Sequence, residues 1–289
     1  MGYRDLFAVR EHRELIEGRQ KLFLLQILSS ILVVMSALVV WFINVRWVDF
    51  FPYTYFSWEF AFSDVTYFWP LFLWGLALSA VTAVGARSSP YDETLLGWSL
   101  VTGWFAAIWE EFAYRWFYIC FGMIGIIFMN WLFGSMFGWV LAAGFLLLAI
   151  KLFLDDEALI GLLLLVPAFA CALFARHADP LFWLYETVFM PILNFASFGA
   201  YTDIIDPTQY DPVFIMGAIA ANAWFRDGHK YQGLFGVMNS WLAGFVLLYA
   251  TLNYGLLTAV VIHGLWNSQI AIVRYLARKI SWVENNQFS

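Results

Sequence analysis

The chain has 289 residues and carries 15 Lys and Arg against 21 Asp and Glu, a formal net charge of −6 at neutral pH. Hydrophobic residues make up 63% of it and charged residues only 12%, about half the roughly 25% of a soluble globular domain. A soluble particle of this size could not bury so many apolar side chains, and the aromatic share of 21% is typical of interfacial belts in membrane proteins. The composition excludes intrinsic disorder, a disulfide scaffold, a coiled coil and a nucleic-acid binder, and it predicts a polytopic protein embedded in a lipid bilayer.

The first apolar segment follows a charged N-terminal stretch. Residues 22–45 contain no charged residue, which is enough to cross a hydrocarbon core at about 1.5 Å of rise per residue. The segment is too long for the apolar region of a signal peptide, and no A-x-A cleavage site ends it. We therefore interpret it as a retained first transmembrane span.

Seven more apolar segments follow, separated by polar loops. They are Tyr67–Ala86, Leu95–Phe121, Trp131–Ile150, Ala158–Ala175, Val213–Trp224, Gly233–Asn253 and Leu256–Tyr275. These segments predict an all-α membrane protein of about eight transmembrane helices. Residues 181–201 contain only Glu186 as a charge and Pro191 as a helix breaker. They could form a ninth span, but this would place the basic C-terminus outside, so we interpret them as an interfacial or re-entrant segment.

Basic residues predict the orientation of the chain, because cytoplasmic loops carry an excess of Lys and Arg. With the N-terminus in the cytoplasm, the predicted outside segments 46–66 and 176–212 contain only Arg46 and Arg176 as basic residues. Most other Lys and Arg residues then fall inside. We therefore expect both termini to be cytoplasmic.

Three ionisable residues stand inside one apolar segment, in the sequence Trp-Glu-Glu-Phe-Ala-Tyr-Arg ending at Arg115. A charge at the centre of a membrane helix costs roughly 2.5–3.5 kcal/mol, so each needs a reason to be there. Glu111 and Arg115 are four positions apart and can pair on one helix face. Glu110 lies about 100° away around the helix, free to face a different cavity, where low dielectric and a neighbouring carboxylate favour a poised base.

Two later segments contain histidines beside other polar groups. His229 belongs to the run Phe225–Gly233 at the end of the sixth apolar segment, and His263 stands four positions before Asn267 in the last one. An imidazole and a carboxamide on one helix face offer two neutral hydrogen-bond donors, as an oxyanion requires. Each group also has a structural interpretation, as an interhelical staple or a bond to neighbouring backbone. The case for function depends on their combination.

That combination resembles the three signature motifs of the CPBP family, which comprises type II CAAX prenyl endopeptidases and bacteriocin-processing or immunity proteins. The matching positions are Glu110-Glu111 with Arg115, Phe225 with His229, and His263 with Asn267. The resemblance covers about residues 95–275. The chain departs from the family in the long separation between the first two motifs.

The resemblance implies three parts in the chain. Residues 1–94 would form a cytoplasmic N-terminal segment and two accessory spans. Residues 95–279 would form the protease core, with the active site inside the helical bundle and an insertion at about 122–212. Residues 280–289 would form a C-terminal tail.

The implied function is that of a glutamic-type intramembrane endopeptidase, which hydrolyses a peptide bond of a membrane-associated protein or peptide. Glu110 with His229 would activate a water molecule, while His263 and Asn267 would donate hydrogen bonds to the oxyanion. The resemblance favours a mechanism without a metal or another cofactor, and the zinc motif His-Glu-x-x-His is absent from the sequence.

Glu111 and Arg115 would shape this site, with Arg115 countering the carboxylate charge. Two alternatives stay open. A non-catalytic immunity or scaffold protein would keep the same fold, and a proton-coupled transporter would also place ionisable residues within the membrane.

Overall fold

The computed structural model describes residues 3–43, 46, 60–86, 95–177, 179–196, 199, 201–202 and 210–287. These residues are helical apart from short connections, and no strand occurs among them. Six of the helical stretches are long and apolar enough to cross a membrane. The predicted all-α class is confirmed, and the six stretches are compatible with a multi-pass membrane protein. The predicted number of eight spans is not confirmed.

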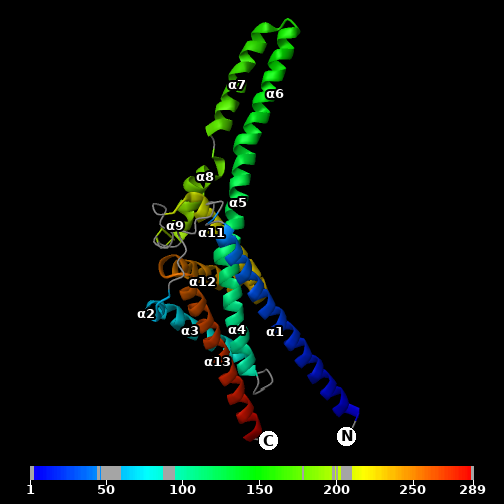
Figure 1. Ribbon diagram of the computed structural model, residues 1–289, viewed down its shortest axis with the longest axis vertical. Coiled ribbons are helices and arrows are strands. Elements are labelled where there is room, and N and C mark those ends of the chain that lie inside the picture. Colours follow the sequence, from blue (N-terminus) through cyan, green and yellow to red (C-terminus); the bar gives the residue numbers. More distant parts are fainter. Residues whose placement is uncertain are drawn as a thin grey trace. The chain divides into compact units, whose positions relative to one another are not determined.

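The helices follow one another along the chain as Figure 1 labels them. The α-helices are α1 (Tyr3–Ile43), α2 (Phe62–Val65), α3 (Trp69–Ala86), α4 (Leu95–Glu111), α5 (Tyr118–Asn130), α6 (Phe137–Leu154), α7 (Ala158–His177), α8 (Pro180–Leu184), α9 (Met190–Ala196), α11 (Pro212–Gly228), α12 (Gly233–Tyr254) and α13 (Leu256–Gln287). Short 3₁₀ turns lie at η3 (Thr66–Phe68) and η7 (Lys230–Gln232), and π-helical segments at η4 (Phe112–Phe117), η5 (Trp131–Met136) and η6 (Tyr185–Phe189).

The predicted third and fourth spans belong to one helical run of 59 residues, Leu96–Leu154. Residues 122–130, which we expected to separate them, contain neither proline nor a charge, so nothing there ends the helix. Gly122 serves close packing instead, because a Cβ at this position would lie 2.9 Å from the carbonyl oxygen of Gly217 in α11. A glycine in an apolar helix can therefore mark a helix contact rather than a turn.

Two other predicted segments also differ in detail. The sixth predicted span corresponds to α11, which is not among the six membrane-crossing candidates. Residues 181–201 contain the short helical pieces α8, η6 and α9, with Glu186 in the π-helical piece, and none of these is such a candidate. Of the polar loops between the apolar segments, residues 87–94 and 203–209 lie outside the described residues. The predicted tail 280–289 is helical as far as Gln287.

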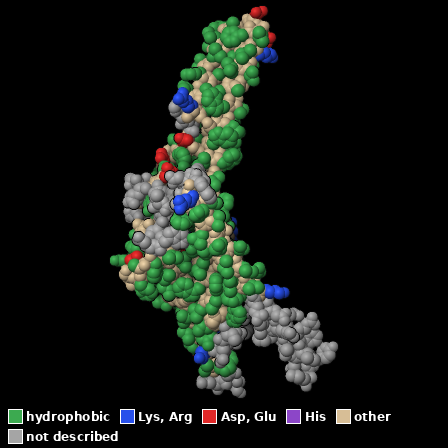
Figure 2. Space-filling model, in the orientation of Figure 1, with side chains coloured by type: hydrophobic (Ala, Val, Ile, Leu, Met, Phe, Trp, Pro, Cys, Tyr) green, Lys and Arg blue, Asp and Glu red, His purple; other side chains and the backbone are tan. Residues whose placement is uncertain are grey.

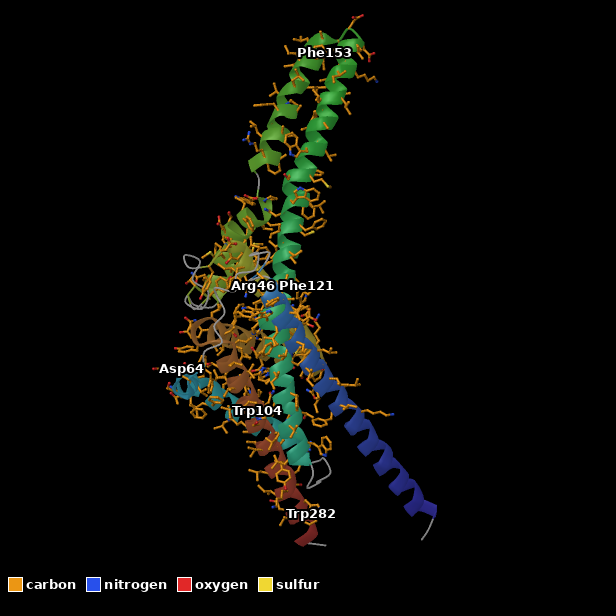
Figure 3. The ribbon with its side chains drawn as sticks, viewed as in Figure 1. Arg46, Asp64, Trp104, Phe121, Phe153 and Trp282 are labelled. Carbon is orange, nitrogen blue, oxygen red and sulfur yellow. The ribbon has the colours of Figure 1, made fainter. Side chains whose placement is uncertain are left out.

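The chain divides into two compact units, residues 1–117 with 222–289, and residues 118–221. In the first unit α13 packs against α3, α4 and α12, and α4 also packs against α1 (Figure 1). Close approach of α4 to α13 depends on Gly264, where a Cβ would come within 2.4 Å of the ring of Trp104. Trp104 is labelled on α4 in Figure 3.

In the second unit, which contains the predicted insertion, α6 and α7 form a helical hairpin. Its turn follows Phe153, labelled in Figure 3, and contains Asp156 with a φ of 64°. The two helices touch through small residues, since a Cβ built on Gly138 would lie 2.7 Å from the Cβ of Ala175. On the face shown in Figure 2, hydrophobic side chains cover most of the coloured surface, as expected for helices that face lipid.

Candidate active site

Glu110 and Glu111 are the last two residues of α4, and Arg115 lies in the π-helical segment that follows. The side chains of Glu111 and Arg115 are 0% and 1% exposed, and Arg115 Nε lies 3.3 Å from Glu111 Oε2. The two residues form the ion pair expected from their spacing. Single π-helical turns inside α-helices occur often at functional sites, and this one begins directly after the carboxylates.

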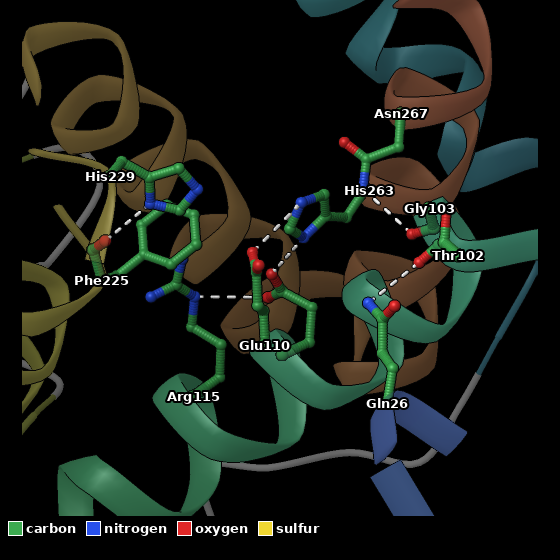
Figure 4. A network of polar contacts seen from close by, with 10 residues as sticks. Gln26, Thr102, Gly103, Glu110, Arg115, Phe225, His229, His263 and Asn267 are labelled. Carbon is green, nitrogen blue, oxygen red and sulfur yellow. Dashed lines mark hydrogen bonds and ion pairs between the residues drawn. The ribbon is translucent and has the colours of Figure 1, made fainter. Parts of the chain in front are cut away.

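Both carboxylates meet the same imidazole, that of His263 on α13 (Figure 4). His263 Nδ1 lies 2.8 Å from Glu111 Oε1, and its Nε2 lies 3.6 Å from Glu110 Oε2. Although the two glutamates leave α4 in different directions, the ring offers one nitrogen to each. Glu110 is the more accessible of the two, with 20% of its side chain exposed. Glu110 therefore does not face a cavity separate from Glu111, as we expected, but shares His263 with it.

The hydrogen bond to Glu111 determines the tautomer of a neutral His263 ring. An ionised carboxylate only accepts hydrogen bonds, so Nδ1 donates to Glu111, whose charge is matched by Arg115. Nε2 then carries no proton and faces Glu110. A proton that enters this cluster can be exchanged between Nε2 and the Glu110 carboxylate.

His229 lies just after α11, in a turn held by backbone and side-chain bonds. Its Nδ1 is 2.8 Å from the carbonyl oxygen of Phe225, which can only accept, so the neutral ring donates there and leaves Nε2 free of a proton. Asp227 accepts hydrogen bonds from Lys230 and from Arg226 on either side of this turn. Those two bonds lower the pKa of Asp227, so the carboxylate stays charged at neutral pH.

Phe225 connects the separate parts of the site. Its ring centroid lies 4.7 Å from that of His229 and 6.2 Å from that of His263. The guanidinium carbon of Arg115 lies 4.9 Å from the same centroid, within the range of a cation–π contact. The sequence marks Phe225 as part of a motif, but its contacts with three polar site residues depend on packing between helices.

Asn267 lies one turn beyond His263 on α13 and contacts α4. Its Nδ2 donates a hydrogen bond to the carbonyl oxygen of Gly103 at 3.0 Å. A Cβ on Gly103 would lie 3.1 Å from the Cβ of Asn267, so the helices are close here. An amide nitrogen has two hydrogens, and the second remains available to a ligand.

Helix α1 also contributes to the site region, which sequence reasoning missed. Gln26 Nε2 donates to the carbonyl oxygen of Thr102, and Ser30 Oγ donates to that of Phe105, both at 3.1 Å. These two residues are four positions apart among the few polar residues of an apolar span, a signal that one face of α1 contacts another helix. The first span is therefore part of the bundle around the site.

A cavity of about 810 Å³ borders these residues within the first unit. Among the predicted site residues, His229, His263 and Asn267 line it, together with Phe225 and Gln26. Glu110 and Glu111 adjoin it through their contacts with His263. The volume falls within the range of about 300–1,000 Å³ typical of ligand pockets.

The fold thus brings all six predicted site residues into one region of the first unit. Glu110 and Glu111 contact His263 directly, and Arg115 joins through Glu111. His229 joins through Phe225, and Asn267 follows His263 on the same helix. Within the described part of the chain, no three or more His, Cys, Asp and Glu residues are grouped so that they could hold a metal ion.

Comparison of the chain with protein-family models, with curated proteins and with solved structures found no match.

Proposed function

We propose that this protein is an intramembrane endopeptidase that hydrolyses a peptide bond of a membrane-associated protein or peptide. One observation carries the proposal: the His263 imidazole lies against two carboxylates beside a cavity of about 810 Å³ in an apolar bundle. Buried ionisable groups that converge at a pocket are typical of catalytic sites. The three motifs support assignment to the CPBP family as part of the same proposal, with both termini in the cytoplasm.

In the proposed reaction, Glu110 and His229 hold the attacking water. Glu110 is the more accessible carboxylate of the pair, and the neutral His229 ring has an unprotonated Nε2 because Nδ1 donates to the Phe225 carbonyl oxygen. One of these groups takes a proton from the water as its oxygen attacks the scissile carbonyl carbon. The proton is then delivered to the amine that leaves when the carbon–nitrogen bond breaks.

The oxyanion that forms on the carbonyl oxygen needs hydrogen-bond donors. Asn267 offers the second hydrogen of Nδ2, since the first is bound to Gly103. His263 offers Nε2–H when the ring is doubly protonated, with Nδ1 still bound to Glu111. Glu111 keeps the ring in position through Nδ1, and Arg115 balances the Glu111 charge.

The proposal is tested by comparing protein termini in native membranes that contain the wild-type chain, Glu110→Gln or Glu157→Gln. Glu157 is an exposed carboxylate in the turn between α6 and α7, which makes it a matched control. Mass spectrometry should find new termini with the wild type and with Glu157→Gln that disappear with Glu110→Gln. Identical termini in all three samples would contradict the proposal.

Proton-coupled transport is the second candidate, because the same ionisable cluster adjoins a cavity. It predicts a different result in the same membranes. Glu110→Gln would leave every terminus unchanged but would abolish a pH gradient-dependent flux of solute. The two readouts therefore separate hydrolysis from transport.

A further inference from the structure

The cavity extends beyond the proposed catalytic residues along one face of α13. His263, Asn267, Arg274 and Arg278 all line it. These positions follow one another at helical spacing, so they form one stripe along the helix. The opposite face carries exposed apolar side chains at Ile272, Leu276 and Ile280, which suit contact with lipid acyl chains.

The end of this cavity at Arg274 and Arg278 carries positive charge, while the Glu110 and Glu111 carboxylates adjoin its other end through His263. Among the described lining residues, the only Lys, Arg, His, Asp or Glu side chains are His229, His263, Arg274 and Arg278. This contrasts with the whole chain, which has a net charge of −6. The fixed positive charge of the two arginines favours an anionic group at their end of the cavity.

Arg278 supplies a second, independent observation. Its Nε atom is buried and has no hydrogen-bond partner among the described residues. A buried N–H group without an acceptor is unfavourable, and a guanidinium binds a planar carboxylate through two parallel hydrogen bonds. A carboxylate in the cavity would satisfy this atom.

We infer that the Arg274 and Arg278 end of the cavity binds a carboxylate of the peptide substrate at a set distance from the scissile bond. This inference rests on the proposed function. Along α13, Arg274 lies about 16 Å and Arg278 about 22 Å from His263, at about 1.5 Å of rise per residue. An extended peptide covers about 3.3 Å per residue, so the carboxylate lies about five to seven residues from the bond.

The test measures binding rather than cleavage, so its result does not depend on whether the protein is a protease. Full-length Glu110→Gln protein is reconstituted in phosphatidylcholine nanodiscs and titrated with fluorescent nonapeptides of Ala and Leu, blocked at both ends. Each contains one Asp or one Asn at the same position, and the position is scanned along the peptide. We expect the best Asp peptide to bind about tenfold more tightly than its Asn counterpart.

Three variants of this protein test whether Arg278 causes the tighter binding of the Asp peptide. Arg278→Gln should remove the Asp preference, and Arg278→Lys should keep part of it because the charge remains without the two-pronged donor. Lys279→Gln changes an exposed cation on the neighbouring position and should keep the full preference. Equal binding of Asp and Asn peptides before any Arg278 change would overturn the inference, as would loss of the preference with Lys279→Gln.

Two further arms identify the source of the carboxylate. An Asn peptide with a free C-terminal carboxylate that binds as tightly as the Asp peptide would assign the site to a chain terminus, still a peptide carboxylate. In nanodiscs containing phosphatidylglycerol, the Asp preference should persist. Its loss there would show that lipid phosphate occupies the arginines and would overturn the peptide assignment.

Discussion

Arg115 and Glu111 are almost completely buried, so the charge of each side chain is stabilised by the opposite charge of the other rather than by water. Removing one member of a buried ion pair leaves an uncompensated charge, and we expect Arg115→Met to lower the free energy of unfolding by about 3–5 kcal/mol. The double variant Glu111→Gln with Arg115→Met should recover part of the loss. Thermal unfolding of the purified protein in detergent measures both effects.

Arg226 provides the control for this prediction, because its ion pair with Asp227 is partly exposed. Surface pairs contribute little to stability, so Arg226→Met should unfold close to the wild-type temperature. Equal unfolding temperatures for Arg115→Met and Arg226→Met would mean that the Arg115–Glu111 pair does not support the fold.

Asn267 is expected to act mainly on turnover. Loss of one oxyanion donor typically lowers the rate about 10²–10³-fold, so Asn267→Ala should lower kcat by this factor with little change in KM. Gln269→Ala is the matched control. Gln269 lies on α13 like Asn267, and its Nε2 also donates to a backbone carbonyl oxygen, that of Phe72, but Gln269 does not line the cavity. A similar loss of kcat in both variants, or a change confined to KM for Asn267→Ala, would remove Asn267 from the oxyanion role.

At the scale of single residues, helical spacing predicted the local contacts and missed the long-range ones. The Glu111–Arg115 pair follows from their separation by four positions. The meeting of both glutamates at His263 and the central place of Phe225 depend on how three helices pack. No periodicity in one sequence contains that information.

The α6–α7 hairpin depends on a close contact between small residues. A methyl group on Gly138 would lie 2.7 Å from the Ala175 Cβ and 2.9 Å from its Cα, so Gly138→Ala should destabilise the hairpin by about 1–3 kcal/mol. Ala175→Gly removes the Cβ that the new methyl group meets, so it should rescue part of this loss. The rescue is incomplete because the contact with the Cα of residue 175 remains. A double-mutant cycle on thermal unfolding measures the coupling, and strictly additive effects would contradict the contact.

At the scale of elements, the apolar segments predicted where helices lie better than where they end. The residues between Phe121 and Trp131 contain neither proline nor charge, so nothing there ends the helix. Proline alone does not mark an end either, because Pro167 lies inside α7. The π-helical turn after Glu111 has no signature in the sequence. Arg115 lies within this turn and contacts the ring of Phe225 on α11.

For the molecule as a whole, both termini are expected on the cytoplasmic side. The distribution of Lys and Arg along the sequence favours this orientation. Single cysteines at Gly2 or Ser289, in a chain with Cys120 and Cys171 replaced by Ala, should both resist an impermeant maleimide in intact cells. Both should react after the cells are broken, and labelling of one end in intact cells would contradict the shared orientation.

Direct observation of hydrolysis by the purified protein is the decisive measurement. Wild-type and Glu110→Gln proteins would be reconstituted in liposomes with a membrane peptide whose terminus depends on Glu110 in native membranes, in water enriched in heavy oxygen. We predict that the wild type produces both fragments and that the new C-terminal carboxylate contains heavy oxygen, while Glu110→Gln leaves the peptide intact. An uncleaved peptide with the wild type, or equal cleavage by both proteins, would contradict catalysis at Glu110.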